Sequence, residues 1–258
     1  MTKTAVHEKS GVKLKNPILI EGLPGLGSVG KIAVTYLTKQ LNANVFARMY
    51  SQHFPYHVIV NKKGSVRMLR YNFYYWKNTD ENADLIFLTG DSQAQTIEGQ
   101  YEIANEILKF ATVHGVKSII ALGGFGTPIT ETEPQVIGVA TSAELLKKLK
   151  DAGVKLSQED VPIVGTAGLL VGLSKFRHTK AACLLGETMG YMPDPKAAKS
   201  VLKALTSILD IEIDFSDLDK EIEKTSKLLN KMKEVEEKIE IYEKTLRKVE
   251  KEKTSYIS

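Results

Sequence analysis

The chain has 258 residues, of which 43% are hydrophobic and 26% are charged, and it contains a single cysteine. This apolar fraction is too high for a disordered protein, and one cysteine excludes both a disulfide framework and a cysteine-based zinc site. No segment has the roughly 18 uninterrupted apolar residues of a membrane helix, and residues 1–15 do not resemble a signal peptide. The sequence therefore predicts a cytoplasmic protein that does not contact a membrane.

The formal net charge of +4 is not concentrated in one place. Residues 217–254 contain 11 acidic and 11 basic side chains, and no run of five or six like charges occurs elsewhere. The most basic stretch, residues 62–70, precedes the aromatic run 71–76. Nucleic-acid interfaces usually gather positive charge on one face. This stretch is more typical of a β-hairpin with a solvated turn and a packed aromatic strand, so we expect no nucleic-acid partner.

Short apolar runs alternate with amphipathic stretches from Pro17 to about Leu209. The pattern predicts strands over 17–21, 44–50, 85–89, 118–122, 136–140, 162–164 and 181–185. It also predicts a hairpin of residues 56–60 and 65–75 that turns at Gly64. Helices are expected over 29–41, 96–114 with Thr96 as the cap, 143–150, 169–176 and 195–209. The alternation indicates an α/β fold, with a mainly parallel sheet flanked by helices on both faces.

The composition changes sharply after Asp210, which divides the chain into an α/β body (1–210) and a helical tail (211–258). Residues 217–254 contain neither glycine nor proline. Their apolar positions recur at spacings of four and three, a heptad pattern formed by Leu228, Met232, Val235, Ile239, Tyr242, Leu246 and Val249. A continuous helix here would extend roughly 55 Å, further than the body is wide. Its stripe therefore needs another helix, subunit or protein, unless the tail breaks near Asn230 and folds on itself.

A glycine-rich segment, residues 23–31, lies where the first strand meets the first helix. It contains the dinucleotide pattern G-x-G-x-x-G and most of a P-loop. A P-loop needs Ser or Thr after its lysine to coordinate Mg²⁺, but Ile32 stands there. A dinucleotide fold needs an acidic residue about 20 positions on, and residues 44–57 contain none. Two interpretations stay open: a tight turn required for packing, or the glycine loop, residues 22–31, of a phosphorylase-like or nucleotide-binding enzyme.

Other candidate chemistry is sparse. Three acids follow predicted strands, where α/β enzymes place ligand groups: Glu21, Asp91 and Glu187. Together with neighbouring glycines they can line a pocket, or they can serve as turn and cap residues. His53 and His57 are four residues apart, but an intervening proline prevents them from sharing a helix face as metal ligands. Cys183 lies in an apolar run typical of a core. We therefore predict no catalytic residue, metal or cofactor.

Four motifs together resemble the proteasome assembly chaperone 2 family, and most closely its archaeal members of the B type. They are Gly22–Gly30 (GLPGLGSVG), Thr89–Gln93 (TGDSQ), Gly165–Leu170 (GTAGLL) and Leu185–Pro195 (LGETMGYMPDP). The resemblance implies a fold similar to that of nucleoside phosphorylases but no enzymatic activity. It also implies chaperones or activators that bind the α-subunit ring of the proteasome core particle as homo-oligomers, such as tetramers, with extended C-terminal helices.

The resemblance also implies a role in binding for the end of the tail. Many proteasome-binding tails end in a hydrophobic residue, tyrosine and any residue, whereas here the tyrosine is third from the end. We expect proteasome contacts from Tyr242, Leu246, Val249, Tyr256, Ile257 and the carboxylate of Ser258. The alternative is an end that binds nothing. The richness in lysine and glutamate is typical of proteins from hot environments.

Overall fold

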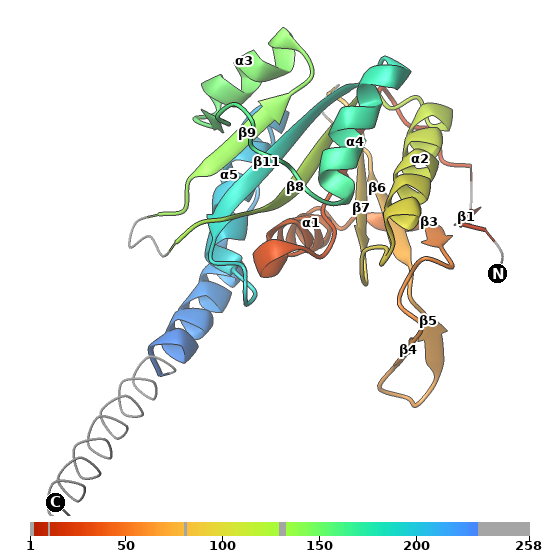
Figure 1. The fold of residues 1–258 in the computed structure, drawn as a ribbon, viewed down its shortest axis with the longest axis horizontal. Helices are drawn as coiled ribbons and strands as arrows, with labels where there is room; N and C mark the ends of the chain where they lie inside the picture. The colour runs from red at the N-terminus through yellow and green to blue at the C-terminus, as the bar shows by residue number, and fades with distance from the viewer. Residues whose placement is uncertain (1–2, 10, 80–81, 129–132, 232–258) are drawn as a thin grey trace, which may run out of the picture. The chain divides into compact units, whose positions relative to one another are not determined.

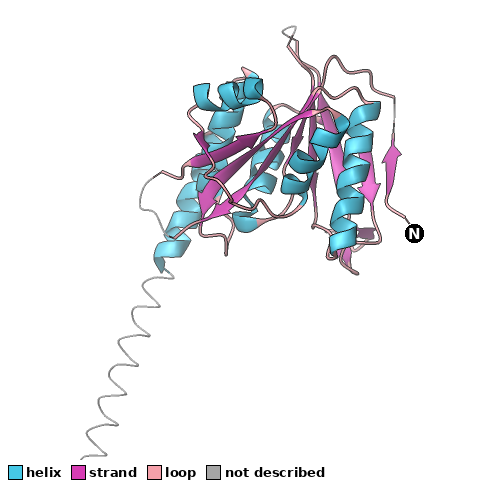
Figure 2. Cartoon of the chain, turned by 45° about the horizontal axis from the view of Figure 1, so that its top comes forward, coloured by secondary structure: helices cyan, strands magenta, loops and turns pink. Residues whose placement is uncertain are grey.

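The computed structural model describes residues 3–9, 11–79, 82–128 and 133–231. The chain forms two compact units, Met1–Phe215 and Ser216–Ser258. The first unit consists of a large twisted sheet with helices on both faces (Figures 1 and 2). In the second unit, residues 216–231 are helical. No described helix combines the length and the apolar character needed to cross a bilayer.

The sheet has nine strands. Their spatial order is β1 (Ala5–Glu8), β3 (Asn44–Tyr50), β6 (Tyr71–Trp76), β7 (Leu85–Gly90), β2 (Ile18–Glu21), β8 (Ser118–Gly126), β11 (Lys180–Thr188), β9 (Val136–Ala140) and β10 (Lys155–Leu156). The four central strands β7, β2, β8 and β11 are parallel neighbours. Antiparallel pairs flank them on both sides. The predicted parallel arrangement is therefore correct for the centre, while the sheet as a whole is mixed.

Helices cover both faces of this centre. α2 (Ile97–Val113) and α4 (Thr166–Ser174) pack on one face, and α1 (Val29–Gln40), α3 (Ala143–Asp151) and α5 (Pro195–Leu209) cover the other. Because both faces are covered, the central strands are mostly apolar, and every residue of β7 is buried. The predicted cap is confirmed: the Thr96 hydroxyl accepts a hydrogen bond from the Gly99 amide at 3.1 Å.

Three sequence predictions about strands are wrong. β1 and β10 were not predicted, because each is short and pairs at the margin of the sheet. Residues 162–164 form no strand, since Pro162 has no N–H for a ladder. The expected strand 65–75 divides into β5 (Val66–Met68), which pairs with β4 (Val58–Val60), and β6. The aromatic side chains of β6 include the fully buried Tyr71 and Phe73, as expected for a packing strand.

An unusually close approach between α1 and the sheet organises the centre. A Cβ atom on Gly30 would overlap the carbonyl oxygen of Leu122 in β8, and a Cβ atom on Gly22 would overlap the carbonyl of Gly30. The backbone of Gly30 therefore packs directly against that of Leu122, and the backbone of Gly22 packs directly against that of Gly30. Only glycine permits so close an approach. Gly22 and Gly30, the first and last glycines of the 22–30 segment, serve this contact.

We predict that Gly30→Ala lowers the free energy of unfolding by about 3 kcal/mol, because the added methyl group displaces backbone rather than a flexible side chain. The matched control is Gly172→Ala, a helical glycine in α4 with open space around its Cβ position. That change should leave stability unchanged or raise it by about 0.5–1 kcal/mol. Urea unfolding of both variants measures the difference, and equal effects would contradict the packing role.

Candidate functional site

The glycine-rich segment does not present a free anion cradle. A phosphate-binding loop directs successive backbone N–H groups at its ligand. Here the amide of Gly27 donates to the Gly190 carbonyl at 3.2 Å, and that of Ser28 donates to the Gly25 carbonyl at 2.9 Å. The Val29 amide donates to Leu26. Three amides at the start of α1 are therefore already used by the protein itself, and the arrangement favours the packing interpretation.

The three strand-end acids lie in separate environments and do not converge on one pocket. The Asp91 carboxylate accepts two hydrogen bonds from the Arg67 guanidinium, at 2.6 and 2.9 Å, and one from the Arg70 amide at 3.0 Å. Glu187 accepts a bond from the Gln135 amide at 3.1 Å. Burial raises the pKa of Asp91, but the bonds from Arg67 and Arg70 outweigh it and hold that pKa below its usual value. Both carboxylates have structural partners.

Glu21 is the buried acid of the core. It ends β2 with 1% of its surface exposed, and its Oε1 atom accepts a bond from the Leu23 amide at 3.1 Å. Its Oε2 atom, like the buried Tyr71 hydroxyl, has no hydrogen-bond partner among the described residues. Burial raises the pKa of Glu21 to about 8, with the Leu23 amide acting in the opposite direction. The group is therefore mostly a neutral acid at pH 7.

A network of hydrogen bonds between polar groups lies at the end of the sheet next to Glu21. The Gln93 side chain donates to the Pro24 carbonyl at 2.6 Å and accepts from the Thr166 amide at 3.2 Å. The Thr166 hydroxyl donates to Gln100 Oε1 at 2.9 Å. These bonds tie the glycine-rich segment, the β7–α2 loop and the start of α4 together. The motifs at 89–93 and 165–170 therefore meet in space as a structural junction.

The histidines and the cysteine have structural environments. His53 Nε2 lies 3.0 Å from Glu102 Oε2, and the other oxygen of Glu102 accepts a bond from the Thr4 amide. Glu102 in α2 therefore holds both the residue that precedes β1 and the loop that follows β3. Cys183 is fully buried, and burial raises the pKa of its thiol above the usual range. Among residues 3–231 that the structure describes, no group of three or more His, Cys, Asp or Glu side chains is placed to hold a metal.

The proteasome contacts expected at Tyr242, Leu246, Val249, Tyr256, Ile257 and Ser258 lie outside the described residues, as does the heptad pattern beyond Leu228. The described start of the tail is a helix with Leu228 half exposed and a lysine-to-glutamate ion pair of 2.6 Å between Lys227 and Glu223. Such pairs at i,i+4 stabilise an exposed helix modestly. These contacts stay predictions.

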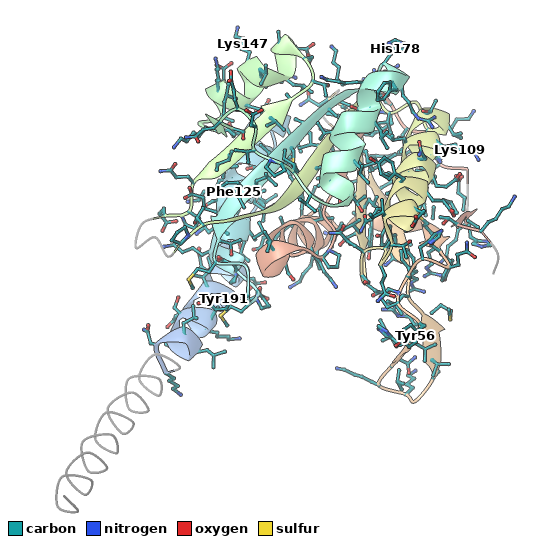
Figure 3. All side chains as sticks on the ribbon, in the orientation of Figure 1. Tyr56, Lys109, Phe125, Lys147, His178 and Tyr191 are labelled. Atoms are coloured by element: carbon teal, nitrogen blue, oxygen red, sulfur yellow. The ribbon has the colours of Figure 1, made fainter. Side chains whose placement is uncertain are left out.

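A hairpin projects from the body. The sequence predicted the hairpin but not the exposure of its apolar face. β4 and β5 extend away from the body, and Figure 3 labels Tyr56 beside them. The ladder pairs Val58 with Met68 and Val60 with Val66, so these four side chains share one face. They are between 46% and 64% exposed, and Tyr56 is 99% exposed. We call Val58, Val60, Val66 and Met68 the hairpin face.

A second group of exposed apolar side chains lies where the central parallel strands end. Leu26 follows β2, Ile97 and Tyr101 begin α2 after β7, and Tyr191 follows β11. Val164 precedes α4, whose first amide bonds to Gln93 at the same edge. We call these five residues the carboxyl-edge patch. Figure 3 shows Tyr191 and Tyr56 at one end of the body and His178 and Lys147 at the other. Exposed apolar side chains gathered at one edge mark a candidate protein–protein contact.

Comparison with known proteins places these features in context. Residues 19–233 match the family model described as PAC2 family. Crystal structures of two Pyrococcus furiosus proteins are similar: PbaB, described as an archaeal proteasome activator, and PbaA, described as an archaeal homologue of proteasome-assembly chaperone. PbaB is 39% identical, over 90% of this chain and 100% of its own, with a TM-score of 0.86. PbaA is 29% identical, over 96% and 98%, with a TM-score of 0.76. An uncharacterised protein of Methanocaldococcus jannaschii is 35% identical, over 88% of this chain and 86% of its own.

The buried acid generates a prediction about pH. The pKa of Glu21 is raised in the folded protein, so between pH ~4.5 and ~8 the unfolded chain loses this proton while the folded chain keeps it. The free energy of unfolding therefore falls as pH rises, with a slope from this group of up to about 1.4 kcal/mol per pH unit. Glu21→Gln, which is neutral at every pH, should remove that slope.

Urea unfolding of the wild type and of Glu21→Gln at pH 5, 6, 7 and 8 measures the effect. The variant should gain relative to the wild type as the pH rises. Glu102→Gln is the control that should show no change of slope across this pH range. Hydrogen bonds from Thr4 and His53 lower the pKa of Glu102 to about 2, so its contribution is fully present above pH ~4.5 and is lost only as the pH falls from ~4.5 through ~2. Parallel profiles for the wild type and Glu21→Gln would show that Glu21 is ionised in the folded protein.

Proposed function

This chain belongs to the PAC2 family, and on that premise we propose that it is a non-enzymatic proteasome chaperone or activator that docks on the α-subunit ring. The observation that carries the proposal is the likeness to PbaB, an archaeal proteasome activator, over the full length of that protein. The identity of 39% and the TM-score of 0.86 both exceed those of more distant solved structures, which are 14–21% identical with TM-scores of 0.65–0.70. The likeness to PbaA, described as an assembly-chaperone homologue, supports the same class of partner.

The interior of the body supports a non-enzymatic role. The amides of the glycine-rich segment are engaged with protein carbonyls. Asp91 is paired with Arg67, and Glu21 is enclosed by the core. An α/β enzyme presents such groups to a ligand at this edge of its sheet. In this chain the same positions hold the fold together, while apolar side chains are the groups presented to the surroundings.

The C-terminal segment is the proposed docking element. Its described part is helical from residue 216 and belongs to a unit separate from the body. We propose that Tyr242, Leu246 and Val249 continue this helix as an apolar stripe, and that Tyr256, Ile257 and the Ser258 carboxylate contact the α-subunits. A homo-oligomer such as a tetramer presents several tails at once, and linked contacts raise affinity by roughly 10² to 10⁴ when they bind simultaneously.

The proposal also includes a cellular location and a type of organism. We propose a cytoplasmic protein of a heat-adapted archaeon, because the relatives come from Pyrococcus furiosus and Methanocaldococcus jannaschii. The two Pyrococcus proteins are described with different roles, activation and assembly. Both roles use the same surface of the core particle in this proposal, so one binding experiment tests them together.

We predict that immobilised full-length protein captures recombinant archaeal α-subunit rings and that the chain truncated after Phe215 does not. Within the full chain, Tyr256→Ala with Ile257→Ala should reduce capture about tenfold or more, because both proposed apolar contacts are lost. Capture is quantified by surface plasmon resonance at several ring concentrations.

The matched control is Thr254→Ala with Ser255→Ala, two changes of similar size immediately before the proposed contacts. It should bind as the wild type does. Thermal unfolding of the truncated chain confirms that its body is folded before binding is measured. Equal capture by the truncated and full-length chains would refute docking through the tail, and no capture by either would refute the proteasome partner.

A further inference from the structure

We propose that the β4–β5 hairpin is a self-association element whose apolar face is covered by the carboxyl-edge patch of a second copy of this chain. The inference deepens the homo-oligomer of the proposed function and rests on it. It assigns that assembly to named surfaces and to one type of contact, in which a hairpin of one protomer meets a different surface of the next.

The hairpin itself requires a cover. A two-stranded ribbon is marginally stable in water unless a face packs against another surface. On the hairpin face, Val58 lies opposite Met68 and Val60 lies opposite Val66, and all four are exposed. Figure 1 shows β4 and β5 extending beyond the sheet, with the body on only one side. The ribbon therefore offers a continuous apolar strip that its own described body leaves uncovered.

The base of the hairpin is held in a defined direction. Arg67 in β5 makes a bidentate ion pair with Asp91, which directly follows β7. The Arg70 amide bonds to the same carboxylate, and Leu69 between them is buried in the core. Bidentate arginine–carboxylate pairs restrict orientation as well as supplying energy. The hairpin face is therefore presented with little freedom to lose, which lowers the entropic cost of association.

The carboxyl-edge patch is a chemically matched acceptor. Its members Ile97, Val164 and Tyr191 are exposed apolar side chains at the other strand ends of the same edge. Exposed acids accompany them: Glu98 follows Ile97, and Glu159 and Asp160 precede Val164 in one loop. The exposed side chains at these loop positions thus combine apolar groups with acids, and protein interfaces likewise combine apolar and polar groups.

Charge identifies a second copy as the occupant. The hairpin segment 56–68 carries Lys62, Lys63 and Arg67 and no acidic residue. Two hairpins packed tip to tip would bring like charges together, whereas a hairpin placed on the carboxyl-edge patch brings its lysines toward these exposed acids. Every chain carries one donor hairpin and one acceptor patch. Such a head-to-tail contact generates a ring when the rotation closes.

The test uses full-length chains whose mass in solution is measured by light scattering and native mass spectrometry. A donor variant carries Val60→Ser, Val66→Ser and Met68→Ser. An acceptor variant carries Ile97→Ser, Val164→Ser and Tyr191→Ser. The wild type should form a multiple of the 28.6 kDa chain, and each variant alone should be a monomer. Mixed in equal amounts, the two variants should form a species of two chains, because one intact hairpin and one intact patch remain.

The control variant carries Val113→Ser and Phe176→Ser, two exposed apolar residues at the ends of α2 and α4. Both helices end at the opposite edge of the sheet, so this variant should keep the wild-type mass. Lys62→Glu with Lys63→Glu, at the exposed turn, provides a second donor test that leaves the apolar face intact. It should weaken self-association most at low salt, where surface charges are least screened.

A monomeric wild type, a donor variant with the wild-type mass, or a mixture without a two-chain species would each overturn the inference. Hairpin-to-hairpin pairing would also overturn the inference, and it would be recognised by an acceptor variant that self-associates on its own. Failure of the proposed function is separable from these outcomes. The chain truncated after Phe215 keeps hairpin and patch, so it should keep the wild-type subunit number while losing α-ring capture. Subunit number unchanged with no capture by any version would leave this inference standing and remove the proteasome partner.

Discussion

The contact of backbone against backbone between α1 and the sheet constrains the rest of the body. Gly22 and Gly30 allow the first turn of α1 to reach the carbonyl of Leu122 without an intervening side chain. This approach forces the preceding residues into a compact turn in which Gly27 and Ser28 have positive φ. In such a turn the amides find carbonyl partners within the protein. The segment resembles a phosphate-binding loop in sequence, but its role here is to hold α1 against the sheet.

The polar side chains at the carboxyl ends of the central strands also hold loops together. Asp91, Gln93 and Thr166 each join segments that are far apart in the chain. Because a buried polar group without a partner is costly, these bonds keep the loops in one arrangement. The consequence is an edge whose inner polar groups are hydrogen-bonded within the protein, while apolar side chains and acids are exposed on its outside. That distribution suits a surface that binds another protein better than one that binds a small polar substrate.

The sequence predicted most elements because the central strands and helices carry strong local patterns. β7 is buried on both faces and is apolar at nearly every position, while α2 and α5 begin with capping side chains from Thr96 and Asp194. Elements that depend on distant partners were missed. β1 pairs only with β3, and the split between β5 and β6 depends on Arg70 meeting Asp91, 21 residues away in sequence.

The exposed hairpin, too, could be predicted from the sequence only in part. The turn at Gly64 and the alternation of Val58 and Val60 predict a hairpin, and its register follows from the turn. Whether its apolar face is covered by the rest of the chain is a property of the assembled body, and no local pattern encodes it. Glu21 illustrates the converse case. Its position at the end of a strand suggested a ligand group, but its burial in the assembled body decides that it is enclosed and mostly neutral.

In the assembly proposed above, the hairpin and the C-terminal tail meet two different physical requirements. A contact between copies must be specific in direction, and the Arg67–Asp91 ion pair would fix the direction in which the hairpin is presented. A contact with a large partner must tolerate a mismatch in symmetry or spacing, and a segment that forms a unit separate from the body is suited to this task. Placing the two requirements on separate parts of one chain allows each to be optimised without weakening the other.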